Sequence, residues 1–192
     1  MASLLHLIVR KDAFALSFAK KMKRLKLYIG MLGVMTALAA TALAATAFGQ
    51  VSLRSLDGRN IDVTAQNGKV VVLVVGASWL PLSEKQAAIT NTLVKKYASK
   101  AVVFYFVATD AEAARNAVSD AALRQFAAKN KIAIPVLRDP DGAVVMSKLK
   151  VEQVPSFVII DKTGSVAGEP FGGLDPKFDT SIPISKAIDK LL

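Results

Sequence analysis

Two long apolar runs rich in β-branched residues limit the fold more than any other feature of the chain. They are "KVVVLVVGA" at residues 69–77 and "AVVFYFVAT" at residues 101–109. Both runs are continuous rather than alternating, which is typical of strands buried on both faces. Between them, apolar residues over 83–98 recur at roughly helical spacing. The pattern predicts an α/β fold in which helices cover a central sheet.

Shorter elements complete this order and predict a single domain at residues 50–192, with a central mixed sheet flanked by helices. Turn residues, β-branched runs and helical spacing mark each of them. They are two short strands around an Asp57-Gly58 turn, a helix over 110–130, a strand and turn in "IPVLRDPDG", a helical turn over 143–150, a hairpin turning at 161–164, and a helix over 183–192.

The positive charge of the chain is unevenly distributed. The formal net charge is +10, and seven basic residues against one acidic residue precede Gln50. Over residues 50–192 the basic side chains are scattered among acidic ones and form no stripe with aromatic residues between them. This distribution predicts no nucleic-acid partner.

The N-terminal region has the composition of a secretory signal. Lys23, Arg24 and Lys26 precede an apolar stretch over 27–43, and small residues follow in "ATAFG" at 45–49. We expect residues 1–49 to be an N-terminal extension and signal peptide, with cleavage near Ala47 or Gly49 and a periplasmic or cell-envelope location.

The same apolar stretch leaves a second interpretation open. Its length approaches the ~20 residues of a membrane-spanning helix, so an uncleaved signal would anchor residues 50–192 to the membrane. In that case the membrane contact is through the signal segment alone. Met22 opens a more ordinary signal than Met1, which favours Met22 as the true start.

The order of the elements and two motifs resemble a known family. "ASWLPLS" follows the first buried strand, and "VEQVPSFVIIDKTG" leads into the hairpin. Together they resemble the thioredoxin-like fold, and within it the exported TlpA/ResA and redoxin-type proteins. The resemblance places the family's Cys-x-x-Cys motif at Leu80-Pro81-Leu82-Ser83, and its cis-proline, which faces that motif, at Pro155.

The chain lacks the cysteines on which the chemistry of this family depends. It contains no cysteine, whereas thiol–disulfide exchange needs an attacking thiolate and peroxide reduction needs a cysteine sulfenic acid. Dithiol chemistry is therefore excluded by composition. Copper-binding relatives use cysteine and histidine, and the only histidine is His6, in the segment that export would remove.

Ser83 has two possible roles that the sequence can weigh. A catalytic serine needs a base, usually histidine, and no spacing selects one here. Gln86 follows three residues later, so the pair fits a helix capping box, which we predict. Pro81 suits a first helical turn and leaves open a cap a few residues earlier.

No cofactor or metal is expected. Asp139 and Asp141 in "RDPDG" are the best candidate cation ligands, but one turn supplies too few oxygens for a calcium site. Aspartate and glycine at such positions usually form the turn itself.

The resemblance implies a binding role for the apolar residues at the position of the family's active site. In active relatives the residue before the cis-proline, here Val154, offers backbone hydrogen bonds to an extended peptide. We predict that an apolar face keeps that role for a protein or peptide partner. The alternative is that Trp79 and Leu80 are core residues. Exposure of Leu82 would favour binding. The predicted face comprises Trp79, Leu80, Pro81, Leu82, Ser83, Val154 and Pro155.

Two other functions remain open. The first is a redoxin-class thiol oxidoreductase or antioxidant protein whose thiol comes from a partner or small molecule bound at the same groove. It predicts activity only with an added thiol, whereas a binding module predicts binding that ignores redox state. The second is a structural domain tethered to the membrane by an uncleaved signal.

Overall fold

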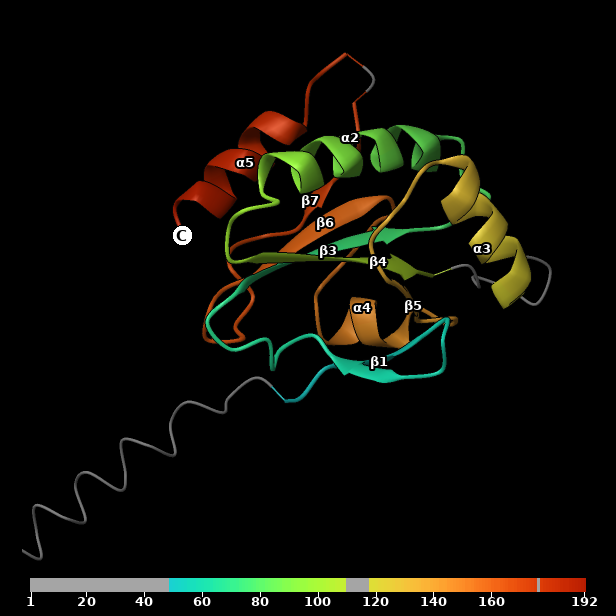
Figure 1. The fold of residues 1–192 in the computed structure, drawn as a ribbon, viewed down its shortest axis with the longest axis horizontal. Coiled ribbons are helices and arrows are strands. Elements are labelled where there is room, and N and C mark those ends of the chain that lie inside the picture. Colours follow the sequence, from blue (N-terminus) through green and yellow to red (C-terminus); the bar gives the residue numbers. More distant parts are fainter. Residues whose placement is uncertain (1–48, 110–117, 176) are drawn as a thin grey trace, which may run out of the picture. The chain divides into compact units, whose positions relative to one another are not determined.

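A computed structural model describes residues 49–109, 118–175 and 177–192. Its strands form one seven-stranded mixed sheet in the order β2-β1-β5-β4-β3-β6-β7 (Figure 1). Helices cover both faces of the sheet, so the predicted α/β architecture with a central mixed sheet is confirmed.

The two apolar runs form the centre of the sheet. β3 (Val70–Gly76) and β4 (Val102–Ala108) pair in parallel, and all seven residues of β3 are buried. β5 (Val136–Arg138) continues the sheet in parallel beyond β4, while β6 (Ser156–Ile160) pairs antiparallel with the other side of β3. The continuous pattern thus correctly indicated strands buried on both faces.

Short strands complete the sheet at both ends. β1 (Ser52–Ser55) and β2 (Asn60–Asp62) form the predicted hairpin, with Gly58 at φ 87° in its turn. β7 (Phe171–Gly172) pairs with β6 at the opposite edge. The predicted turn at 161–164 closes with a hydrogen bond from Gly164 N to Asp161 O.

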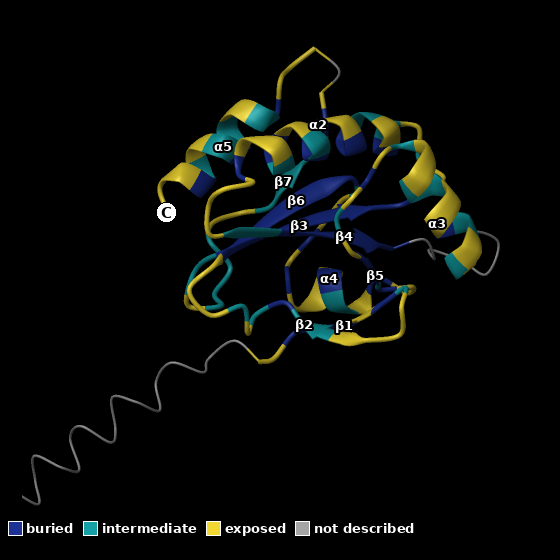
Figure 2. Ribbon diagram, viewed as in Figure 1, coloured by how far each residue is buried: buried dark blue, intermediate teal, exposed yellow. Residues whose placement is uncertain are grey.

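Alternate side chains of β3 enter two separate cores, one on each face of the sheet. Val70, Val72 and Val74 pack in the core that includes side chains of α2 (Leu82–Lys96), α3 (Asp120–Lys129) and α5 (Ser181–Asp189). Val71, Leu73 and Val75 pack in the core that includes α4 (Ala143–Ser147) and β1. Figure 2 shows this continuous burial of the central strands.

Some of the sequence-based expectations lie outside the described residues. The signal segment at residues 1–48 and the first part of the helix expected over 110–130 are among them; the second part is α3. Within the described ranges, no helix is both long and apolar enough to cross a membrane.

Lys150 adopts a left-handed backbone conformation, with φ 54°, just after α4. The bond from Val151 N to Val145 O (3.1 Å) closes the chain across this residue, whose positive φ is one that glycine adopts without steric cost. We expect Lys150→Gly to raise the free energy of unfolding by about 1 kcal/mol, because glycine avoids the Cβ penalty. Denaturant unfolding would measure the change.

Lys148→Gly is the matched control. Lys148 has right-handed helical angles, so glycine there is expected to lower the free energy of unfolding by roughly 0.5–1 kcal/mol. A loss of stability at both positions would contradict the conformational explanation for Lys150.

Candidate functional site

The predicted binding face lies where β3 ends and α2 begins. After Gly76 the chain turns through two hydrogen bonds, from Leu80 N to Ala77 O (3.1 Å) and from Ser83 N to Leu80 O (3.0 Å). α2 then starts at Leu82, with Pro81 at its N-cap position. The turn therefore places residues 78–82 at the end of the sheet, where the parallel strands finish.

Ser83 does not cap the helix, so the predicted capping box is wrong. Its side chain is fully buried, and its hydroxyl donates a hydrogen bond to the carbonyl oxygen of Ala77 at 2.6 Å. Helix α2 has no side-chain cap hydrogen bond. The hydroxyl instead ties the first turn of α2 to the end of β3.

Gln86 also has a different role from the predicted one. It is fully buried, and its Nε2 donates to the carbonyl oxygens of Val75 (3.0 Å) and Ser156 (2.9 Å). These two residues are register partners on β3 and β6. Gln86 therefore connects α2 to both strands at the point where their pairing ends.

Gly76 leaves the space that Gln86 needs. The Oε1 atom of Gln86 is buried and has no hydrogen-bond partner among the described residues, and a Cβ added at Gly76 would lie only 2.4 Å from it. An α-hydrogen of Gly76 occupies that direction in place of a side chain, which leaves room for the amide oxygen. The glycine and the glutamine are thus sterically matched.

The loop before β6 borders the same end of the sheet. The Val154-Pro155 peptide bond is cis, as the family resemblance implies. Pro155 is buried, while Val154 is half-buried. Within the described ranges, the backbone N–H and carbonyl of Val154 have no hydrogen-bond partner, which leaves them available to a ligand.

The apolar residues of the face are only partly buried. Trp79 is 42% exposed and belongs to neither core, so the alternative that places Trp79 in the core does not hold. Pro81 is exposed, whereas Leu80 and Leu82 are half-buried. Because Leu82 is intermediate, its burial does not decide between binding and packing.

Asp139 and Asp141 shape the turn between β5 and α4. The Asp139 carboxylate accepts hydrogen bonds from Val144 N (3.3 Å) and Val145 N (2.8 Å), and Asp141 accepts one from Ala143 N. Burial raises the pKa of the Asp139 carboxyl, while the backbone donors oppose that shift. The described residues contain no group of three His, Cys, Asp or Glu side chains placed to hold a metal ion.

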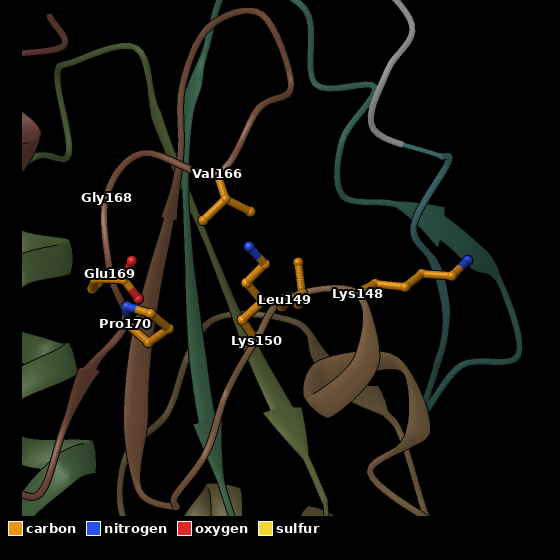
Figure 3. A pocket seen from close by; sticks show the side chains of 7 residues that line it. All are labelled: Lys148, Leu149, Lys150, Val166, Gly168, Glu169 and Pro170. Atoms are coloured by element: carbon orange, nitrogen blue, oxygen red, sulfur yellow. The ribbon is translucent and has the colours of Figure 1, made fainter.

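Sequence reasoning missed the structural pairing of Gly76 and Gln86. Its only signal was the break of the apolar run at Gly76. It also missed a cleft beside the loop at 148–156, part of which is shown in Figure 3.

Comparisons with known proteins agree with this geometry. The Redoxin family model matches residues 34–180. The thiol-disulfide oxidoreductase ResA of Bacillus thuringiensis subsp. konkukian is 30% identical over 114 residues, which cover 59% of this chain and 61% of that relative. The chain thus spans about three fifths of the length of this curated relative.

Solved structures show the same fold. A secreted Mycobacterium tuberculosis disulfide oxidoreductase homologous to E. coli DsbE superposes with a TM-score of 0.57 and 23% identity, over 74% of this chain and 96% of that one. The exposed lipoprotein thioredoxin Etrx1 of Streptococcus pneumoniae gives 0.60 and 22%, over 74% and 100%. The fold is thioredoxin-like.

Proposed function

Because the chain belongs to the Redoxin family and yet contains no cysteine, we propose that it is an exported, redox-inactive member that binds an extended peptide or protein segment. The bound segment lies against Trp79, Leu80, Pro81 and Leu82 and hydrogen-bonds to the backbone of Val154. This is strand addition at an exposed main-chain edge.

The exposure of Trp79, together with the unpaired main chain of Val154 at the same end of the sheet, carries the proposal. A tryptophan that is 42% exposed offers a large apolar surface, and tryptophan is enriched among residues that dominate binding energy. The Val154 main chain has no hydrogen-bond partner among the described residues and supplies one donor and one acceptor. These are the two components of peptide recognition by strand addition.

The polar groups of the site support binding rather than catalysis. Leu80 has no nucleophile, and the buried Ser83 hydroxyl donates to Ala77 O instead of to a base. The amide of Gln86 is likewise used internally, on Val75 and Ser156. These groups stabilise the shape of the face and leave its apolar side chains to contact a partner.

An extracytoplasmic location accompanies this proposal. It is supported by the basic and apolar segment at residues 23–49. It is also consistent with the similar structures of a secreted oxidoreductase and an exposed lipoprotein thioredoxin.

Site-specific photo-crosslinking in the cell envelope tests the proposal. A photoreactive amino acid at Leu82 is expected to capture a defined partner, whereas one at Lys95, exposed on α2, is not. Trp79→Ala is expected to reduce capture by about 30-fold, the equivalent of ~2 kcal/mol for a tryptophan at the centre of an interface.

Redox conditions separate this function from that of a thiol-dependent enzyme. Capture at Leu82 is expected to be equal with and without an added thiol. Capture that appears only with thiol would support the oxidoreductase alternative, and equal capture at positions 82 and 95 would contradict the binding face.

A further inference from the structure

A cleft extends from the candidate site along one side of the sheet. It consists of two hollows, of about 210 Å³ and about 220 Å³, which share Lys150, Glu169 and Pro170. The second hollow reaches Ser156, the residue directly after Pro155. The two hollows therefore adjoin at these three residues, and the second ends beside the backbone proposed to bind a peptide.

The two walls of the cleft carry opposite charges. Lys150 projects from the loop before β6 and Glu169 from the segment before β7, and Val166 and Leu149 also line the hollow (Figure 3). Both charged residues are exposed, and neither forms an ion pair or hydrogen bond within the described ranges. Lys148 points away from the other labelled side chains and donates to Gln50 O at 3.2 Å.

The loop wall also offers main-chain groups. Among the described residues, the backbone groups of Lys150, Glu152 and Val154 have no hydrogen-bond partner, whereas Val151 N between them donates to Val145 O. An extended chain lying in the cleft would find donors and acceptors at intervals from Val154 to Lys150. The cleft is thus suited to a main chain with side chains on both sides.

We propose that the peptide bound at Val154 continues through this cleft and carries an acidic and a basic residue at neighbouring positions. The acidic residue faces Lys150 and the basic residue faces Glu169. Successive side chains of an extended chain point to opposite sides, so neighbouring residues meet opposite walls. This inference rests on the proposed function and specifies which peptides the site selects.

The charges act mainly on selectivity. Partly exposed ion pairs add little affinity, but a peptide with the reverse charge order would place like charges together at both walls. Discrimination then arises from repulsion as much as from attraction. A single charge reversal on the protein is expected to weaken binding of a selected peptide by about tenfold.

Selection from a random library of displayed 12-residue peptides on the immobilised full-length chain tests the inference. Enriched peptides are expected to carry adjacent acidic and basic residues a few positions from an apolar residue. Lys150→Glu and Glu169→Lys should each weaken binding of an enriched peptide about tenfold. The double variant should select the exchanged charge order, while Lys95→Glu, an equal change on exposed α2, should alter nothing.

The outcomes separate this inference from the proposed function. Peptide binding that is lost in Trp79→Ala but is indifferent to both reversals would overturn the charge-reading cleft and leave the peptide-binding face in place. No enrichment over the uncoated support, or enrichment unaffected by Trp79→Ala, would overturn both.

Discussion

The double variant Leu80→Cys/Ser83→Cys is expected to form an internal disulfide and to gain thiol–disulfide exchange activity. The present chain has no cysteine, so any such activity would be new. The expectation follows from the geometry of the turn at the start of α2, where the resemblance places the family's Cys-x-x-Cys motif.

Two features of that turn favour the bond. The hydrogen bond from Ser83 N to Leu80 O (3.0 Å) closes a four-residue turn, and such turns hold their first and last Cα atoms less than about 7 Å apart. Disulfides need roughly 4.4–6.8 Å between Cα atoms. Position 80 is half-buried at the N-terminus of α2 while position 83 is fully buried, so the first thiol is the accessible one and the helix lowers its pKa.

Mass spectrometry and a reduction assay would check this result. The oxidised double variant should be two hydrogen masses lighter than its reduced form and should catalyse insulin reduction by dithiothreitol. The single variants Leu80→Cys and Ser83→Cys are the controls, since neither can close an internal bond. Two free thiols persisting under mild oxidant would show that the turn no longer has the geometry of an active relative.

The sequence predicted elements whose signals are local. The continuous apolar runs identified β3 and β4 because burial on both faces requires apolar residues at every position. The Asp57-Gly58 and 161–164 turns were equally local. The cis peptide bond at Pro155 followed from resemblance alone, because cis bonds occur at only ~5–6% of X–Pro sites in folded proteins.

The role of Gln86 could not be predicted in the same way. The spacing of Ser83 and Gln86 satisfies the capping-box pattern, but that pattern does not include Ser156, which lies 70 positions further along the chain and accepts one of the glutamine's hydrogen bonds. The Gln86 side chain is buried, and a buried amide must hydrogen-bond to other buried groups, so it bonds to Val75 and Ser156 rather than capping the helix. Lys150 and Glu169 are likewise distant in the sequence and line one cleft only in the folded chain, so no local pattern predicts it.

Gly76→Ala and Gln86→Ala are each expected to destabilise the protein substantially. The first places a Cβ 2.4 Å from Gln86 Oε1, and such overpacking costs about 1–3 kcal/mol. The second removes the donor shared by the Val75 and Ser156 carbonyls, and the loss of each intramolecular hydrogen bond costs about 0.5–1.5 kcal/mol. Gln125→Ala, exposed on α3, is a matched control for the glutamine change.

The double variant Gly76→Ala/Gln86→Ala separates steric fit from a general intolerance of the site. Truncating the glutamine removes the atom that the new Cβ meets, so the double variant should be about 1–2 kcal/mol more stable than the sum of the single effects predicts. Denaturant unfolding of the four proteins gives this coupling free energy. A coupling near zero would mean that Gly76 is required by its backbone or by Phe106, whose ring lies 3.2 Å from the same added Cβ. A positive coupling would identify the Gly76 and Gln86 pair as the contact that holds the cysteine-free turn against β3 and β6.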